Sequence, residues 1–369
     1  MVRWNETSEG WAGRVLPVTP PATPYLRLDL ERLNRNIEAT ARWVADRGLL
    51  LRPHVKMHKS PDVARLQLAA GAVGLTVATI GEAEVMAAAG CEDLFIAYPL
   101  HVNDQAVRRL TAVASVATVA LGVDSEAGAR HAGSALAGTG IEVMVEIDCG
   151  HHRTGCSPTA AGQVAAAASS AGVGVRGVFT FPGHSYDPQA RSAAAQTEAS
   201  ALAAARRSVE EQGLSISTVS GGSTPSLAYT DADVLTEVRP GVYAFGDAQQ
   251  WELGAMEPSH IALTCRATVV SHAGGRAVLD SGSKALAADR GFYNTGGGRL
   301  LDHPEARIVL LSEQHAVVDM GPRPLPPIGS QVDVVPNHCC AATNLADTMW
   351  ADDGAGLHPW PVAARGLNH

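Results

Sequence analysis

The stretch Ile141-Glu142-Val143-Met144-Val145-Glu146-Ile147 is one of eight short apolar runs that decide the fold of this chain. Between residue 50 and about residue 240, these runs alternate with Ala-rich segments of helical character. The runs cover residues 50–55, 74–78, 93–97, 117–121, 141–147, 175–181, 215–219 and 235–239. Eight strand–helix units in succession predict an α/β fold of the (β/α)8 TIM barrel type, with a doubly wound sheet as the alternative.

The character of the sequence changes after about residue 250. Residues 269–280 read as a hairpin around two glycines, and residues 308–311, 315–319 and 331–335 are further strand candidates punctuated by proline and glycine. The strand-like segment 25–30 precedes the eight runs and is expected to pack on this later part. We therefore predict a barrel over residues 31–250 and a mostly β domain formed by residues 1–30 and 251–369.

Composition and charge exclude several classes of partner. The chain of 369 residues is 46% hydrophobic and carries a formal charge of −9, which argues against nucleic acid and anionic membranes as partners. No apolar run approaches the ~20 residues of a membrane span, and residues 1–6 begin no apolar signal segment. The six cysteines form no Cys-x-x-Cys motif, so reduced thiols and a cytoplasmic location are expected.

The first candidate for chemistry is Lys56, within Arg-Pro-His-Val-Lys-Met-His-Lys at residues 52–59. This motif follows the first barrel strand, and the C-terminal ends of barrel strands carry the active site. A partly desolvated lysine amine at that place can act as a nucleophile. The alternative interpretation is a solvated basic turn that precedes the next helix.

Two glycine-containing loops follow the seventh and eighth strands, at residues 219–225 and 239–242. Backbone amides of such loops bind anions, and barrels often hold phosphate there. Either loop alone is most often only a turn, but the two together favour a phosphate site. The polar loops 146–155 and 181–186 follow the fifth and sixth strands, and each taken alone is better explained as a polar loop with structural ion pairs than as a functional site.

A candidate metal pair stands in the β domain, at His338 and Cys340. Residues two apart in an extended segment project to the same side, and imidazole with thiolate suits zinc. Two protein ligands are fewer than a zinc site usually has, so a metal here would keep open positions for water or substrate. From the pattern alone, a buried cysteine beside a satisfied histidine is the more common case.

Together these residues resemble one family. The 52–59 motif, Asp-x-Gly-x-x-Arg-x-Gly at residues 148–155, Ser-Gly-Gly-Ser-Thr-Pro at residues 220–225 and the late His-x-Cys resemble the D-serine dehydratase and D-threonine aldolase family. That family belongs to the alanine-racemase-like, fold-type III pyridoxal-phosphate enzymes. The resemblance covers residues 25–366 and implies an alanine-racemase-type barrel with a β domain. It also implies pyridoxal 5'-phosphate, a divalent metal, a D-amino acid substrate and a head-to-tail homodimer.

The resemblance assigns the cofactor contacts by position. Lys56 matches the lysine that binds pyridoxal phosphate covalently. Arg153 resembles the arginine on the side of the cofactor's phenolic oxygen, and Arg239 resembles the arginine that faces the pyridine nitrogen in alanine racemases. The implied phosphate cup consists of Ser220, Gly221, Gly222, Ser223, Gly241 and Val242.

The resemblance also bears on the metal and the reaction. His338 and Cys340 match the metal pair, with zinc expected and manganese or magnesium as alternatives. Lys56 would take the Cα proton, and His184 or His58 would serve as a second base or as an orienting group. The family's dehydratases have His-x-Cys, whereas its better-known aldolases have His-x-Asp.

The predicted activity is therefore that of a lyase on β-hydroxy-D-amino acids, with β-elimination to a 2-oxo acid and ammonia. The alternatives are retro-aldol cleavage to glycine and an aldehyde, and an amino-acid racemase. Arg239 slightly favours a racemase, but racemisation needs no metal. A non-catalytic carrier of the cofactor would leave the metal pair unexplained.

Overall fold

Eight parallel strands form a closed ring in the structure, a computed structural model that describes residues 21–369. They pair in the order β2-β9-β8-β7-β6-β5-β4-β3. His54, just after β2, bridges in parallel to Thr76 of β3 and closes the ring. The predicted barrel is thereby confirmed, with all eight strands present. Their bounds are β2 (Leu50–Leu51), β3 (Leu75–Val77), β4 (Asp93–Pro99), β5 (Thr118–Val123), β6 (Glu142–Glu146), β7 (Gly174–Phe179), β8 (Thr218–Gly221) and β9 (Glu237–Val238).

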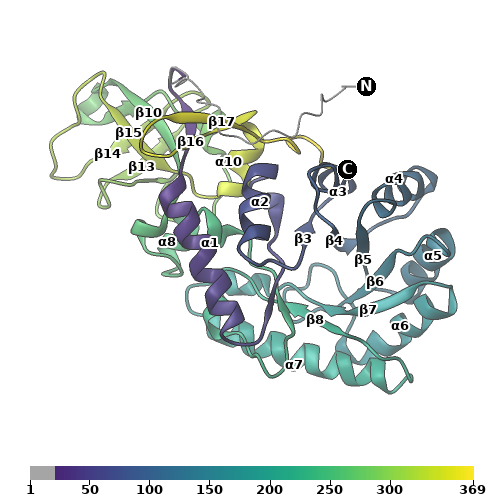
Figure 1. The fold of residues 1–369 in the computed structure, drawn as a ribbon. Coiled ribbons are helices and arrows are strands. Elements are labelled where there is room, and N and C mark those ends of the chain that lie inside the picture. The colour runs from purple at the N-terminus through teal and green to yellow at the C-terminus, as the bar shows by residue number, and fades with distance from the viewer. Residues whose placement is uncertain (1–20) are drawn as a thin grey trace.

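Helices surround this ring (Figure 1). Those that follow the strands are α2 (Pro61–Ala69), α3 (Ile80–Ala88), α4 (Asp104–Ala114), α5 (Glu126–Leu136), α6 (Ala161–Ser170), α7 (Arg191–Glu210) and α8 (Ala248–Glu252). After β8 the chain makes only the single turn η4 (Leu227–Tyr229), and α1 (Leu30–Ala45), which precedes β2, packs on β2. Several helices begin at capping side chains, such as Thr79 before α3 and Asn103 before α4.

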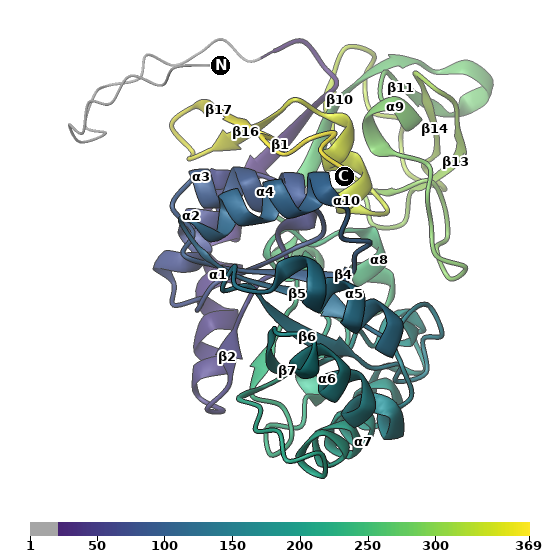
Figure 2. The ribbon, with the colours of Figure 1, turned by 90° about the vertical axis from the view of Figure 1, so that its right-hand side faces the viewer.

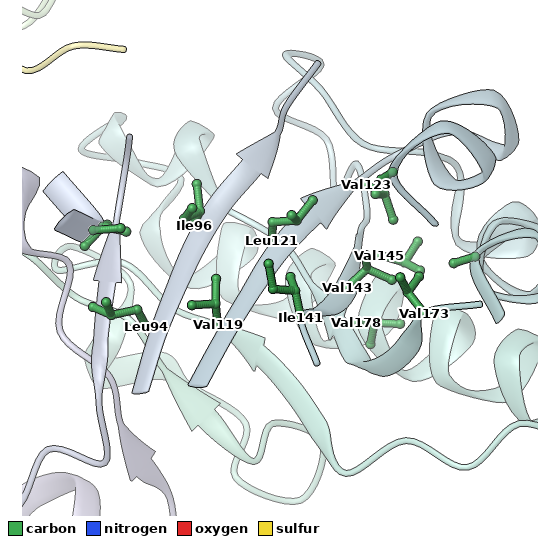
Figure 3. Close-up of a cluster of buried hydrophobic side chains, with 14 of the residues drawn as sticks. Leu94, Ile96, Val119, Leu121, Val123, Ile141, Val143, Val145, Val173 and Val178 are labelled. Atoms are coloured by element: carbon green, nitrogen blue, oxygen red, sulfur yellow. The ribbon is translucent and has the colours of Figure 1, made fainter. Parts of the chain in front are cut away.

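The alternation of side chains along the strands separates two parts of the barrel core. Leu94 and Ile96 belong to the large cluster between strands and helices, shown with residues of β5, β6 and β7 in Figure 3. Phe95 points the other way and packs with Phe179 inside the ring, with ring centroids 4.8 Å apart and edge to face. Side chains therefore fill the barrel interior, and its open end is at the C-terminal ends of the strands.

The β domain has its own sheet and its own hydrophobic core. Its main strand order is β13-β14-β11-β10-β1-β16-β17, and β15 pairs with β10 and β12. The predicted hairpin is β10–β11, which turns through η7 (Ala273–Gly275). The strands are β1 (Tyr25–Asp29), β10 (Leu263–Ser271), β11 (Ala277–Leu279), β12 (Arg299–Leu300), β13 (Arg307–Leu311), β14 (Ala316–Asp319), β15 (Gln331–Val335), β16 (Thr348–Asp352) and β17 (Leu357–Pro361).

Strand β1, which precedes the barrel in the sequence, belongs to the same sheet as the later strands of the β domain. β1 pairs antiparallel with β10, so the segment before the barrel joins the β sheet. Residues 1–20, which include the predicted start of the β domain and the N-terminal residues 1–6, lie outside the described residues. The boundaries after residues 30 and 250 stay a prediction. None of the helices within residues 21–369 has the length and apolar character to cross a membrane.

Two short helices complete the β domain, α9 (Ser283–Leu286) and α10 (Cys339–Leu345). The β domain packs against the barrel beside α1 and α2 (Figure 2). Helix α10 contacts the turn η1 (Val55–Met57) after β2, so a segment of the β domain reaches the mouth of the barrel. The remaining single turns are η2 (Pro158–Ala160), η3 (Gly183–Tyr186), η5 (Val242–Ala244) and η6 (Pro258–His260).

Candidate active site at the barrel mouth

Lys56 presents an amine without a counter-charge at the mouth of the barrel. The chain has three lysines. Lys59 pairs with Glu82 and Lys284 pairs with Glu313, whereas Lys56 makes no ion pair within residues 21–369. Lys56 lies in η1 and is exposed, and its Nζ is 5.7 Å from the centroid of the Phe181 ring. An exposed, unpaired amine is available to form a covalent bond with a carbonyl compound.

Positive side chains from three loops converge on His54. Burial lowers the pKa of His54 well below its usual value, and the charges of Lys56, Arg239 and Arg153 lower it further. Arg153 also lies 5.3 Å from the centroid of the Phe181 ring, which Lys56 approaches as well. The loops after β2, β6 and β9 therefore bring the predicted lysine and both predicted arginines to one place, an arrangement suited to an anionic ligand.

Arg239 is buried between the barrel interior and the mouth. Its Nε donates to Ser220 Oγ at 2.9 Å and its Nη2 donates to the carbonyl oxygen of Thr180. The guanidinium lies 5.3 Å from the ring centroid of Phe179 and 5.6 Å from that of Phe95. Burial lowers the pKa of Arg239, although neighbouring carboxylates oppose this. Nη1 is the guanidinium nitrogen without a hydrogen bond to residues 21–369.

The turn after β8 is held by a carboxylate that the sequence prediction did not include. The N–H of Gly222, whose φ is +80°, donates to Glu198 Oε1 on α7 at 2.7 Å. A Cβ at Gly221 would lie 2.4 Å from the same oxygen, so only glycine fits there. Glu198 is buried, and burial raises its pKa to about 7, against the lowering effects of the Gly222 hydrogen bond and of Arg239.

The other predicted phosphate contacts lie close to this turn, but their hydroxyl groups face inward. Ser220 Oγ donates to Glu237 Oε1 at 2.7 Å, and Ser223 Oγ lies 2.9 Å from the hydroxyl of Ser185. A Cβ at Gly241 would lie 3.0 Å from the carbonyl oxygen of His54, so this position suits glycine and no side chain covers its backbone. Val242 begins η5. The N–H groups of Gly222 and Ser223 donate to Glu198 Oε1 and Ser226 Oγ, so the backbone at Gly241 and Val242 is the part of this cradle that fits a phosphate group.

His338 is the N-cap residue of α10 and Cys340 lies in its first turn. His338 Nδ1 lies 2.5 Å from Asp289 Oδ2. Burial acts to lower the pKa of His338, but the Cys340 thiolate and Asp289 raise it to about 11. A hydrogen bond from Cys339 and the charge of His338 hold the pKa of Cys340 well below its usual value. Imidazole and thiolate are a donor set that fits zinc, although no three His, Cys, Asp or Glu side chains of the described part converge as a metal site.

Asp247 fixes the backbone of this pair from the barrel side. Its Oδ2 accepts a hydrogen bond from the N–H of Cys339 at 3.1 Å, and its Oδ1 accepts one from Gln250 at 2.9 Å. Asp247 is fully buried, and burial raises its pKa to about 6, although the charge of His338 opposes the shift. The segment after β9 is therefore tied directly to the turn that carries both candidate metal ligands.

Lys56 and the His338–Cys340 pair lie close together at the barrel mouth. The hydrogen bond from Cys339 is the largest cause of the low pKa of Cys340, and the charge of Lys56 contributes to it as well. Helix α10 contacts η1, the turn that carries Lys56. Residues almost three hundred positions apart in the sequence are thus brought within electrostatic reach of one another at the barrel mouth.

The two predicted histidine bases have different surroundings. Both ring nitrogens of His58 are bonded in the buried region: Nδ1 accepts from Ser60 N–H at 3.0 Å and Nε2 lies 3.3 Å from Gln67 Oε1. Burial lowers the pKa of His58 to about 4. His184 is partly exposed and its Nε2 lies 2.9 Å from Thr197 Oγ1, while its Nδ1 has no partner in the described part of the chain.

Three acidic residues of this region were not among the predicted site residues. Glu198 shares a face of α7 with the buried residues Ala194 and Leu202. A carboxylate on an otherwise apolar helix face is the sequence signal that could have identified it. Asp247 stands at the N-cap position before α8, a signal that indicated only a helix start. Asp289 meets His338 across 49 positions of sequence, and no local pattern reveals that contact.

Comparison with known proteins agrees with this arrangement. Residues 28–249 match the model of the alanine racemase N-terminal domain, and residues 262–351 match that of the putative serine dehydratase domain. D-threo-3-hydroxyaspartate dehydratase of Delftia sp. is 34% identical over 92% of this chain and 98% of its own. D-threonine aldolase of Arthrobacter sp. is 32% identical over 95% of each chain.

A solved structure gives the same result in three dimensions. A cysteine-to-alanine variant of D-threo-3-hydroxyaspartate dehydratase in the metal-free form has a TM-score of 0.85 and 31% identity, covering 92% of this chain and 97% of that one. The two domain matches together span most of the described residues, in the order that the fold requires. The chain therefore belongs to the D-serine dehydratase and D-threonine aldolase family of alanine-racemase-like, fold-type III pyridoxal-phosphate enzymes.

Proposed function

We propose that this chain is a pyridoxal-phosphate- and divalent-metal-dependent lyase that converts β-hydroxy-D-amino acids to a 2-oxo acid and ammonia. One observation carries the proposal: the lysine without an ion pair lies within electrostatic reach of the His338–Cys340 pair, which comes from the other domain. Relatives named for a dehydratase and for an aldolase of β-hydroxy-D-amino acids support the substrate class.

The residues at the barrel mouth would hold the cofactor as follows. Lys56 would bind it covalently, Arg153 would lie on the side of its phenolic oxygen, and Arg239 would offer Nη1 to the ring nitrogen. The backbone of residues 241–242 would hold its phosphate, beside the turn 220–223, in which the N–H groups of Gly222 and Ser223 donate to Glu198 and Ser226. When bound, pyridoxal phosphate withdraws electrons from the Cα of an amino acid.

The side chain of Lys56 is the group best placed to take the Cα proton. Its amine is exposed and forms no ion pair within residues 21–369. For a second base we favour His184 over His58, because the His184 ring is partly exposed and only its Nε2 is hydrogen-bonded within residues 21–369, whereas its Nδ1 is buried without a partner there.

His338 and Cys340 would hold the metal, and we propose zinc. Because Nδ1 of His338 is engaged by Asp289, the opposite nitrogen, Nε2, is left for a ligand bond. A metal with only two protein ligands keeps open positions and would polarise the substrate's β-hydroxyl group as a Lewis acid. A solved cysteine-to-alanine variant of a relative is named as its metal-free form, which agrees with metal binding in that relative.

Retro-aldol cleavage to glycine and an aldehyde is the second candidate, because aldolases are among the relatives at similar identity. The two reactions differ at the β-hydroxyl group, which leaves with its electrons in elimination and loses its proton in cleavage. Cys340, rather than the aspartate of the better-known aldolases, favours elimination. Racemisation would give the His338–Cys340 pair no role.

Product analysis decides between these reactions. The purified chain, loaded with pyridoxal phosphate and zinc, is incubated with D-serine, D-threonine and D-3-hydroxyaspartate. A 2-oxo acid with ammonia supports the proposal, glycine with an aldehyde supports the aldolase, and the L-enantiomer supports a racemase. The homodimer and the cytoplasmic location stay predictions, and light scattering after gel filtration tests the first.

A further inference from the structure

Lys59 adopts a backbone conformation that its surroundings must hold in place. Its φ is +50°, a value uncommon for residues other than glycine. It lies three positions after Lys56, and its N–H donates to the carbonyl oxygen of Val55 at 2.8 Å, which closes the turn around Lys56. Such a conformation persists where contacts on several sides determine it.

The buried ammonium group of Lys59 has three partners from three elements. Nζ donates to Asn344 Oδ1 of α10 at 2.8 Å and to Asn368 Oδ1 near the C-terminus at 2.9 Å. It also lies 3.4 Å from Glu82 Oε1 of α3, a carboxyl group that is itself buried. A buried cation with one carboxylate and two amide oxygens is fully satisfied and therefore fixed in direction.

Hydrogen bonds fasten the segment 364–369 to the backbone of Lys59 and to the start of helix α3. The N–H of Ala364 donates to the carbonyl oxygen of Lys59 at 3.1 Å. Thr79 Oγ1 donates to the carbonyl oxygen of Leu367 at 2.7 Å, and Gly81 N–H donates to that of His369 at 3.1 Å. A Cβ at Gly81 would lie 2.7 Å from Leu367 Cβ, so this close approach depends on glycine.

We infer that Lys59 is a positioning residue that fastens the Lys56 turn to helix α10, and so fixes the cofactor lysine relative to the metal pair. Asn344 belongs to the same short helix as Cys340, so the Lys59–Asn344 hydrogen bond joins the two halves of the site. The segment 364–369 holds Lys59 from the other side. This inference rests on the proposed function, because it concerns the distance between its two reactive parts.

The test is Asn344→Ala in the full chain, with Asn368→Ala as a second variant that also leaves the Lys59–Glu82 pair intact. Lys284→Met, which removes an exposed ion pair of the β domain, is the matched control. We expect Asn344→Ala to lower kcat roughly tenfold or more with little change in KM, since small misplacements of reacting groups are costly. We also expect an altered visible circular dichroism band of bound pyridoxal phosphate, and faster amide hydrogen exchange in residues 55–60.

Amide hydrogen exchange tests the inference in the absence of pyridoxal phosphate. If exchange in residues 55–60 is the same in Asn344→Ala, Asn368→Ala and the unchanged chain, the inference is wrong, whether or not the chain binds pyridoxal phosphate. If kcat and thermal stability fall together while the circular dichroism band stays unchanged, the role is only structural and the inference is again wrong. Absence of yellow absorbance in the unchanged chain contradicts the proposed function instead.

Discussion

Asp289 Oδ2 lies 2.5 Å from His338 Nδ1, so one nitrogen of the candidate metal-binding imidazole is already committed to a carboxylate. This contact fixes the ring and its tautomer, and it leaves Nε2 for a metal. The loop before β12 thus orients a side chain at the start of α10. A neutral partner at position 289 would still accept a hydrogen bond but would make the imidazole less basic.

Asp289→Asn should therefore weaken zinc binding about 10- to 100-fold. Competition with a chromophoric chelator measures the zinc affinity directly. Asp302→Asn, in the same domain and without a contact to His338, is the control. Equal zinc affinity in Asp289→Asn and in the unchanged chain would show that the carboxylate has no part in holding a metal.

Lys56→Ala should abolish the yellow absorbance of bound pyridoxal phosphate and reduce turnover by about 10³-fold or more. The reason is that neither Lys59 nor Lys284 offers a free amine. Absorbance spectra after gel filtration in the presence of the cofactor measure this. Lys284→Met should retain the colour, and retention of the band in Lys56→Ala would contradict the assignment of the cofactor lysine.

Removal of metal should stop turnover but leave the cofactor bound. The His338–Cys340 pair lies on α10, whereas the proposed cofactor contacts lie on the barrel loops, so a chelator acts on only one of them. We expect D-serine elimination to cease with a strong chelator and to return with zinc, at unchanged yellow absorbance. Turnover that continues in the chelator would favour a racemase.

Much of this architecture follows from patterns that are local in the sequence. The eight apolar runs appear as eight barrel strands because alternation and length identify a strand without tertiary information. Lys56, Arg153 and Arg239 meet because each follows a barrel strand, and all such ends lie at one mouth. The resemblance added the metal pair, which composition alone left undecided.

The contacts that complete the site were beyond local patterns. Lys59 and Asn368 are 309 positions apart, and their hydrogen bond depends on the position of the last segment on α3. The inward direction of the Ser220 hydroxyl depends on its hydrogen bonds with Arg239 and Glu237, which are both buried. Side-chain direction of this kind is set by packing, so the sequence could place the loop but not its hydrogen bonds.

Glu198 gives a prediction about pH and stability. Burial raises its pKa to about 7 in the folded protein, above the ordinary value of 4.5, even though the Gly222 N–H and Arg239 favour its charged form. The folded state therefore binds this proton more tightly than the unfolded state. The free energy of unfolding should fall as pH rises from about 4.5 to about 7, by up to about 3 kcal/mol from this group.

Glu198→Gln removes this ionisation but keeps a side-chain oxygen that can accept the hydrogen bond of Gly222. We expect the variant to be more stable than the unchanged chain at about pH 8, where Glu198 is charged, and to lose that advantage as pH falls below about 4.5. Denaturant unfolding across this range measures the difference. Glu210→Gln is the control, because Glu210 is an exposed residue of the same helix paired with Arg206. The prediction is wrong if the difference in free energy of unfolding between Glu198→Gln and the unchanged chain is the same at every pH. In that case the carboxyl group of Glu198 ionises without cost in the folded protein, and a charged side chain holds the turn after β8.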